Sequence, residues 1–507
     1  MIENARAGSL DVREVVGSVS VGSRVAEEEI ESLTKYFVET ESWRRVQQGE
    51  VDIVFAPKGG GKSAIYAMLV ASEDEFFDRG ILVARADNPK GDPAFSAVTN
   101  DTTEEEFRDL WKLYFVVLLA EIFSDYSFNS PPAKQLHRIL GDAGLLPDVV
   151  KRRQTLVAKL LAYIRRIGGQ GVQSVETGFN VGAEGATVTP KVVFREITDS
   201  DRKTGTTNLN DLMALAQEAL DYAECSVWIL LDRLDAAFLE SERLERNALR
   251  GLFRAYRDMG VMANVALKIF LRTDIWNAVV EGGFREASHI IRTLEVQWNP
   301  EDLMQLVIQR LAQSSKLLQH YSVPDDGLAT ARGRNRFFYQ VFPRQIDPGE
   351  KKPDTFDWCL SRTADGRAIN APRELIHLFE EVRAKELKLF ELGTANPVGT
   401  AIFDSRAFKD ALPAVSNSRI YQTLLAENPT ITSKVEGLRG GKTRHSIDSL
   451  MLAWNVSRSE AATAAEQLVK LGFFEPRQND FWIPFLYRPG LALIQGSAAG
   501  VSATDNE

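Results

Sequence analysis

The sequence predicts an α/β fold, in which a parallel β-sheet is covered by helices on both faces and is followed by an all-helical region and a small helical domain with a β-hairpin. Three observations predict it. Apolar strands alternate with helical patterns up to about residue 298, several of these strands are apolar almost throughout, and the pattern changes to helices after Trp298. Continuous apolar strands are typical of sheets that are buried on both faces.

Length, composition and charge limit the function. A chain of 507 residues suggests roughly two to four domains, and 44% hydrophobic residues are enough for globular folding. The 60 basic and 70 acidic residues give a net charge of -10, which excludes a generally cationic nucleic-acid-binding protein. Cys225 and Cys359 lack metal-ligand spacing and are typical of a reduced protein. Because neither a signal peptide nor a long uncharged apolar segment is evident, we expect a cytoplasmic protein without a membrane partner.

The first elements of the predicted sheet follow one another in regular order. An amphipathic helix over 26–48 leads into an apolar strand at 51–55, and after a run of glycines a helix is predicted at 62–71. A second strand at 81–87 precedes a long helical pattern at 103–123. The order strand, helix, strand, helix predicts parallel strands, because parallel neighbours need a crossover connection.

An insertion at about 125–205 interrupts this order. Residues 125–165 are helical in pattern, and the glycine-rich, β-branched segment 168–198 predicts a hairpin or a mobile insertion. The alternation then returns, with a helix at 208–222, a strand at 227–232, a helix at about 240–259 and a strand at 265–274. We therefore predict one α/β core over 26–298, preceded by a tail at 1–25.

Two further domains are expected after the core. A helical lid over 299–398 begins at an Asn-Pro helix start and contains a loop region at 322–356. Residues 399–490 predict a winged-helix domain, in which helices precede a turn and the apolar strand "FWIPFLYR" at 481–488. The last residues, 491–507, are expected to be a flexible tail.

The stretch "APKGGGKS", Ala56 to Ser63, lies between the first strand and the following helix and has the spacing of a phosphate-binding loop. In such a loop backbone N–H groups at a helix N-terminus converge on phosphate oxygens, and glycines allow the backbone to approach them. Lys62 would reach the β and γ phosphates, and the Ser63 hydroxyl would bind Mg²⁺. The alternative is a glycine turn with a chance Gly-Lys-Ser. The residues predicted to bind ATP are Ala56, Lys58, Gly59, Gly60, Gly61, Lys62, Ser63 and Ala64.

Acidic residues follow the strand "VWILLD". A phosphate-binding loop needs an acidic residue at the tip of a neighbouring buried strand to hold the Mg²⁺ shell, and Asp232 stands at that place. Asp235 would orient or activate the attacking water, or it is a helix N-cap or turn residue. Arg233 occupies the position directly after Asp232, so the adjacent Asp-Glu pair of many ATPases is absent.

Two arginines are candidates for contact with the phosphates. Arg272, with Thr273, ends the strand beside the predicted Mg²⁺ strand and would sense the γ phosphate, unless Arg272 only forms an ion pair with Asp274. Arg373 is expected in the first turn of a helix in the lid, from which its guanidinium would contact phosphates. An exposed helix arginine without that role is the alternative.

With "KGGGKSAIY", "LLDRLDAAF", "FLRTDIW" and "FWIPFLYR", the sequence resembles bacterial P-loop ATPases of the AAA+/STAND class over about residues 20 to 490. The resemblance implies an ATP-binding core, a helical lid and a winged helix, arranged much as in origin-recognition-type initiators and STAND regulators. It implies that the segment Gly22 to Glu27 lies near the adenine. It also implies that Asp232 is the Walker B acid, Arg272 the first sensor and Arg373 the second.

Two departures from the pattern matter for catalysis. Ala56 replaces the leading glycine of the loop, which puts little in doubt, whereas Arg233 and Ala236 stand where related ATPases often have an acidic residue. We therefore expect slow hydrolysis and a nucleotide-controlled switch. The resemblance further implies an arginine finger that acts in trans, for which the sequence does not rank the candidates Arg254, Arg257, Arg285 and Arg292.

Three hypotheses remain for the biological role. In the first, ATP drives homo-oligomerisation and regulates a separately encoded protein effector, as in bacterial antiphage defence. In the second, the winged helix binds DNA as in an origin-recognition initiator, and in the third the chain is a scaffold that keeps its nucleotide.

Charge bears on the choice between them. Segment 332–352 has a net charge of +4 and segment 434–444 a net charge of +3. They would contact DNA phosphates in the second hypothesis, and the alternative is that they are only solvated surface. The recognition helix over 459–470 is alanine-rich with two glutamates and one lysine, which is poor for a DNA groove, so we expect this domain to contact protein.

Overall fold

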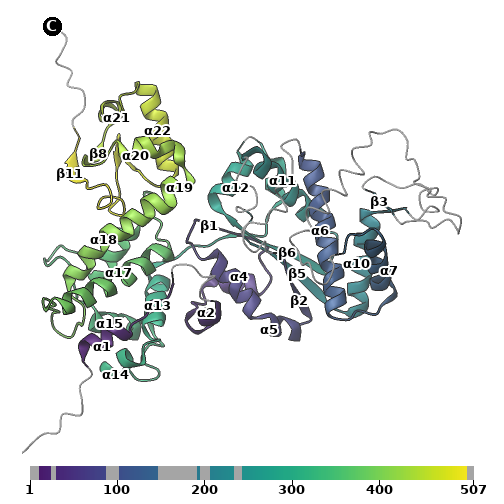
Figure 1. Cartoon of the computed structure of the whole chain (residues 1–507), viewed down its shortest axis with the longest axis horizontal. Helices are drawn as coiled ribbons and strands as arrows, with labels where there is room; N and C mark the ends of the chain where they lie inside the picture. The colour runs from purple at the N-terminus through teal and green to yellow at the C-terminus, as the bar shows by residue number, and fades with distance from the viewer. Residues whose placement is uncertain are drawn as a thin grey trace, which may run out of the picture. The chain divides into compact units, whose positions relative to one another are not determined.

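The computed structural model describes residues 11–23, 30–86, 102–146, 191–193, 206–232, 234, 242–281 and 283–498. The chain divides into two compact units. The sheet unit comprises Glu41–Pro57 and Lys62–Val296, and the helical unit comprises Met1–Thr40, Lys58–Gly61 and Gln297–Glu507. Four residues of the glycine-rich loop are thus grouped with the helical unit. Figure 1 labels the elements of both units.

The sheet unit is built on a five-stranded sheet whose order is β2-β5-β6-β1-β7 and whose neighbouring strands all pair in parallel. The strands are β1 (Ile53–Ala56), β2 (Ile81–Arg85), β5 (Ser226–Leu231), β6 (Val265–Arg272) and β7 (Thr293–Glu295). The predicted α/β class with a parallel sheet is confirmed. The sequence prediction missed the short edge strand β7.

Successive side chains of a strand point to opposite faces of the sheet. Successive residues of the interior strands are buried, so both faces of the sheet are covered. On one face Ile229 and Ile269 belong to a hydrophobic cluster with side chains of α6, α10 and α11. On the other face the Trp228 ring packs against Phe76 in a tilted arrangement, with ring centroids 4.8 Å apart. Figure 1 shows these helices around the sheet. They are α4 (Lys62–Ala71), α5 (Glu73–Asp78), α6 (Glu104–Asp125), α10 (Leu209–Ala223), α11 (Glu242–Met259) and α12 (Thr273–Val280).

Helix boundaries of this unit follow local signals. Thr103 caps α6, and Asn208 caps α10, each through a hydrogen bond to a backbone N–H one turn into the helix. Within the predicted insertion the structure describes α7 (Pro131–Asp142) and the short parallel strands β3 (Lys191–Val193) and β4 (Thr206–Asn208). The predicted hairpin segment lies largely outside the described residues.

The helix predicted over 26–48 is wrong in its continuity. The structure has two helices, α2 (Ile30–Tyr36) and α3 (Glu41–Gln47), and the chain between them is not helical. Val38 and Thr40 in this break are both buried, so the backbone leaves the helix where these side chains pack. The boundary between the helical unit and the sheet unit falls directly after Thr40.

The helical unit has its own hydrophobic core. Val15 and Val16 of α1 are buried in it, so part of the segment predicted as an N-terminal tail is folded. The predicted loop region 322–356 likewise contains a helix, α15, with Phe337 and Phe338 buried. The helices of this part are α1 (Val12–Ser18), α13 (Pro300–Leu311), α14 (Ser315–His320), α15 (Ala331–Val341), α16 (Thr355–Thr363), α17 (Pro372–Glu391) and α18 (Ser405–Arg419).

The remainder of the helical unit continues from α18 through a π-helical turn, η5 (Ile420–Leu424), and combines short helices with a small sheet of order β11-β8-β10-β9. The helices are α19 (Leu425–Glu427), α20 (Thr432–Glu436), α21 (Ile447–Trp454) and α22 (Arg458–Lys470), and the strands are β8 (Lys442–His445), β9 (Glu475–Arg477), β10 (Asp480–Trp482) and β11 (Ile494–Ser497).

Two predictions for this part are corrected. The strand predicted at 481–488 ends at Trp482, because Pro484 has no N–H for a further ladder bond. The predicted C-terminal tail includes β11, which pairs with β8. None of the helices in the described part of the chain is both long and apolar enough to cross a bilayer.

Candidate phosphate-binding site

The glycine-rich loop leaves the end of β1 and enters the first turn of α4, as the motif requires. Gly59 and Gly61 have φ angles of +77° and +98°, a region that residues with a Cβ rarely adopt. A Cβ on Gly59 would lie 2.8 Å from the Cβ of Arg373, so there is also no room for a side chain at this position. The Trp298 indole N–H donates to the Gly60 carbonyl at 2.9 Å and fixes the middle of the loop.

Lys62 and Ser63 open α4 and are both partly exposed. The Lys62 ammonium donates to the Ala56 carbonyl across the loop, at 3.4 Å. Helix N-termini favour anions, because their first N–H groups have no partner within the helix. The geometry therefore brings a lysine, a hydroxyl and helix N–H groups to one place, and their roles toward ATP remain predictions.

Asp232 directly follows β5 and is buried, with 5% of its surface exposed. The sequence analysis expected Asp232 at the tip of a strand next to β1. That expectation is wrong, because β6 lies between β1 and β5. Two strand spacings of about 5 Å each thus separate β5, which Asp232 follows, from β1, which leads into the loop. Asp232 still stands at the carboxyl edge of the sheet, which parallel strands share. Arg233, Asp235 and Ala236 lie outside the described residues.

Arg272 is the last residue of β6 and pairs in register with Ala56 at the start of the loop. Its guanidinium forms two hydrogen bonds with the Asp274 carboxylate, at 3.0 and 2.6 Å. Burial alone would raise the pKa of Asp274, but the Arg272 guanidinium more than offsets it, and the pKa is lowered. Thr273 donates to Glu295 at 3.1 Å. The ion pair weighed as the alternative is present, and the sensor role stays a prediction.

A pocket of about 490 Å³ lies in the helical unit. Arg373 lines it from the first turn of α17, the position that the sequence predicted. Gly22 and Ser23 also line the pocket. They are the described part of the segment Gly22 to Glu27, which is expected near an adenine. The other lining residues are Lys58, Glu374, His377, Glu380, Val415, Ser418, Arg419, Gln422 and Thr423.

Two ion pairs at this pocket were missed by the sequence analysis. The Lys58 ammonium lies 2.6 Å from a Glu427 carboxylate oxygen, and the Arg419 guanidinium lies 2.9 Å from that of Glu374. Burial disfavours the charged form of Arg419, but Glu374, Tyr487 and Asp365 together outweigh it and raise the pKa of Arg419. Nothing local in the sequence indicates either pair, because the partners are far apart along the chain.

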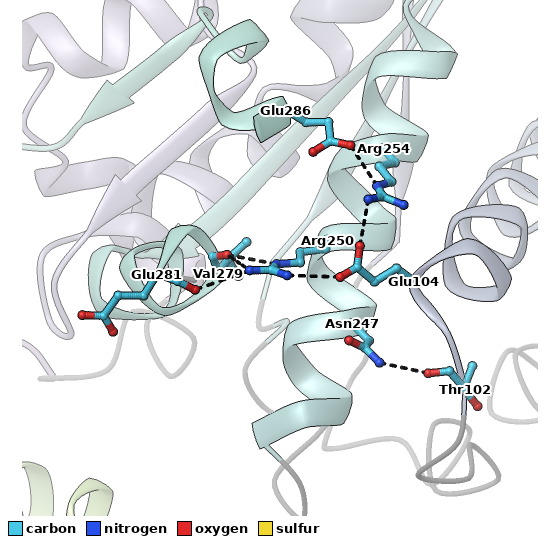
Figure 2. A network of polar contacts seen from close by, with 8 residues as sticks. All are labelled: Thr102, Glu104, Asn247, Arg250, Arg254, Val279, Glu281 and Glu286. Atoms are coloured by element: carbon cyan, nitrogen blue, oxygen red, sulfur yellow. Dashed lines mark hydrogen bonds and ion pairs between the residues drawn. The ribbon is translucent and has the colours of Figure 1, made fainter. Parts of the chain in front are cut away.

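The structure places two of the four arginine-finger candidates in ion pairs within the sheet unit. Figure 2 shows Arg254 of α11 between Glu104 and Glu286, at 2.9 and 3.2 Å. The neighbouring Arg250 contacts the other oxygen of Glu104 at 3.2 Å. Arg292 contacts Asp52 at 3.0 Å. The Glu104 contacts link the start of α6 to α11. The Arg292–Asp52 contact links the residue before β7 to the residue before β1.

The positively charged segments of the helical unit are partly neutralised. Arg344 pairs with Asp354, and Arg444 pairs with Asp480, and both carboxylates lie outside the two segments. Because each of these guanidinium groups already has a carboxylate partner, the surplus of positive charge read from the sequence is weaker in the fold.

No protein-family model and no curated protein matches this chain. Solved structures of low similarity include the Aeropyrum pernix ORC2 protein in ADPNP-ADP complexes, with 14% identity, a TM-score of 0.39, and coverage of 92% of this chain and 93% of that chain. The Aeropyrum pernix ORC1 protein in complex with DNA has 11% identity, a TM-score of 0.31, and coverage of 95% and 96%. The ADP form of ORC2 has 12% identity, a TM-score of 0.32, and the same coverage.

These TM-scores are too low to carry an argument for this chain. Its fold rests on its own topology, in which β1, an interior strand of a parallel sheet, leads through a glycine-rich loop into a helix. The chain has an α/β P-loop NTPase core followed by helical regions.

Proposed function

We propose that this chain is an ATP-binding, slowly hydrolysing ATPase of the AAA+/STAND type, which acts as a nucleotide-controlled oligomerising switch. The observation that carries the proposal is the loop between β1 and α4, where two glycines with positive φ precede Lys62 and Ser63 at a helix N-terminus. In the proposal the loop N–H groups and Lys62 bind the phosphates.

Magnesium would be held by Ser63 and Asp232. A hydroxyl and a carboxylate are hard oxygen donors, the type that Mg²⁺ prefers, and both follow strands at the carboxyl edge of the sheet. When bound, the ion would neutralise charge on the phosphates. Arg272 at the end of β6 would sense the terminal phosphate, Asp235 would orient the attacking water, and Arg373 would contact phosphate from α17.

The role that we propose for this switch is control of a separate protein effector, as in antiphage defence, by a homo-oligomer in the cytoplasm. Paired arginines on the C-terminal sheet support protein rather than DNA as its partner, since Asp480 and Glu475 neutralise Arg444 and Arg477. An origin-recognition-like DNA-binding ATPase is the alternative. Trp482 favours it, because an aromatic ring can stack on a base, and the guanidinium carbons of Arg444 and Arg477 lie 5.5 and 4.8 Å from its ring centroid.

Native mass with and without ATP tests the proposed switch. The wild-type chain is expected to change its oligomeric state with Mg²⁺ and ATP, while Lys62→Ala is expected to remain as it is without nucleotide. Asp232→Ala is expected to bind ATP but to lose Mg²⁺-dependent turnover. Lys388→Ala is a matched control, since Lys388 is an exposed lysine paired with Glu391. An unchanged mass of the wild type across ATP concentrations would refute the switch.

A DNA titration tests the alternative. A salt-dependent shift of duplex DNA at micromolar protein would favour the origin-recognition-like function over the protein effector.

A further inference from the structure

Two arginines and two aromatic rings of the helical unit form a cluster, here called the arginine stack, which consists of Trp358, Arg362, Phe485 and Arg488. The guanidinium carbon of Arg362, on α16, lies 4.7 Å from the ring centroid of Trp358 and 4.2 Å from that of Phe485. The guanidinium carbon of Arg488 lies 4.0 Å from the centroid of the same Phe485 ring. The two guanidinium carbons are therefore no farther apart than the sum of 4.2 and 4.0 Å.

Hydrogen bonds fix both guanidinium groups in the stack. Arg488 Nε donates to the Ile483 carbonyl at 2.8 Å, and Arg488 Nη1 donates to the Gln495 amide oxygen at 2.7 Å. Arg362 Nη1 donates to the Ser361 hydroxyl at 2.7 Å. A guanidinium has five N–H donors in its plane, and stacking on a ring leaves the donors at its edge in place for other partners. Both arginines thus have a fixed orientation and further donors.

Neither guanidinium of the stack forms an ion pair with a carboxylate in the part of the chain that the structure describes. Two carboxylates act on the stack electrostatically, but each already has its own cation. Asp347 lies 2.7 Å from the Lys409 ammonium. Glu475 lies 2.7 Å from the Arg477 guanidinium. The charges of the two stacked arginines therefore remain without a carboxylate of their own among these residues.

This charge lies at the surface. Phe485 is 41% exposed, and Arg362 and Arg488 are both partly exposed. Burial, and next the charge of Arg362, lower the pKa of Arg488 to about 10, so both arginines are still charged at neutral pH. Two like charges held close together repel each other, and an anion placed beside both would remove that repulsion. The stack is thus suited to an anionic partner.

The stack favours a protein carboxylate over a nucleic acid. Sites for single-stranded nucleic acid present aromatic faces on which bases stack, whereas two guanidinium groups already lie over the Phe485 ring. The net charge of -10 of the chain also opposes a long polyanion. In an extended peptide, two acidic residues separated by one residue lie about 7 Å apart, which is within the largest possible separation of the two guanidinium carbons.

We propose that the arginine stack is a docking site for an acidic, extended segment of the protein effector, in which two carboxylates separated by one residue bind Arg362 and Arg488. The inference rests on the proposed function only in taking the partner to be a protein. Each carboxylate accepts N–H hydrogen bonds from the edge of one guanidinium, and such charge-assisted bonds are among the strong ones. The exposed part of the Phe485 ring packs against methylene groups of the peptide.

Two variants and one control test the docking site in the full chain. Gln495→Glu places a carboxylate where Arg488 already donates to an amide oxygen of the same shape, so it gives the stack an internal partner without removing a contact. Arg488→Met removes one of the two guanidinium groups. Gln467→Glu is the matched control, because Gln467 is an exposed glutamine of α22 and lies outside the stack.

The probe is a rhodamine-labelled peptide, Gly-Ser-Glu-Ala-Glu-Ser-Gly, and its binding is measured by fluorescence anisotropy with and without ATP. The wild type is expected to bind it saturably with a Kd of no more than about 1 mM, and the analogue with Gln in place of both Glu about tenfold more weakly. Gln495→Glu and Arg488→Met should each bind the acidic peptide at least about fivefold more weakly. Gln495→Glu should keep the Tm of the wild type, and Gln467→Glu should keep its affinity.

Equal affinity of the wild type and Gln495→Glu for the acidic peptide, equal affinity for the two peptides, or no binding at all would overturn the docking site. A labelled single-stranded oligothymidylate that binds more tightly than the peptide, and is lost in Gln495→Glu, would assign the stack to nucleic acid and would also overturn it. Failure of the proposed ATPase has a different signature, since the wild type would then bind no ATP. A peptide affinity that Gln495→Glu lowers would support the docking site in that case too.

Discussion

The ion pair between Arg419 and Glu374 is buried in the helical unit. Arg419→Met would remove the guanidinium and leave the Glu374 carboxylate, 6% exposed, without its positive partner. The second oxygen of Glu374 has no hydrogen-bond partner among the described residues, so no hydrogen bond to that oxygen replaces the lost contact. We expect a cost of about 3–5 kcal/mol in the free energy of unfolding, the usual cost of breaking a buried pair from one side. This corresponds to a loss of roughly 10 °C in Tm.

Differential scanning calorimetry of the full chain measures this effect. The double variant Arg419→Met with Glu374→Met removes both charges at nearly constant volume, and it should recover most of the lost stability. A loss of less than about 1 kcal/mol in the single variant, the value of an exposed pair, would refute the assigned burial. So would a double variant whose loss is the sum of the two single losses, because it would show that the two charges do not interact.

Two further predictions concern the loop and a buried carboxyl. Gly59→Ala should reduce ATP affinity at least tenfold in a titration, because its Cβ would lie 2.8 Å from that of Arg373 at a φ of +77°; wild-type affinity would contradict the loop geometry. Burial raises the pKa of Glu386 from its ordinary 4.5 to about 7, so its contribution to stability is full below about pH 4.5 and is lost as the pH rises through 7. Thermal unfolding against pH should show this decline in the wild type and a weaker one in Glu386→Gln, and parallel curves would contradict it.

The strands and the phosphate-binding loop were predictable because their signals are local. The helix predicted at 62–71 is α4, and the buried strands lie within two residues of their predicted bounds. A strand buried on both faces must be apolar at nearly every position, so its sequence shows it directly. The glycine run is equally direct, since φ angles of +77° and +98° exclude most other residues.

What the sequence could not predict depends on contacts between distant residues. The insertion of β6 between β1 and β5 moved Asp232 one strand away from its expected place, and strand order has no local signal. The pair of Lys58 with Glu427 joins residues that only the fold brings together. Buried Val38 and Thr40 divide a helix whose periodicity looked continuous, because tertiary packing outweighs helix propensity.

The most direct test of the account is calorimetric titration of the wild-type chain and of Lys62→Ala with ATP and Mg²⁺. The account predicts saturable binding to one site per wild-type chain and at least a tenfold loss of affinity, about 1.4 kcal/mol, in Lys62→Ala, with Lys388→Ala unchanged. Equal affinity of the wild type and Lys62→Ala, or no binding to the wild type, would contradict the phosphate-binding role of the loop.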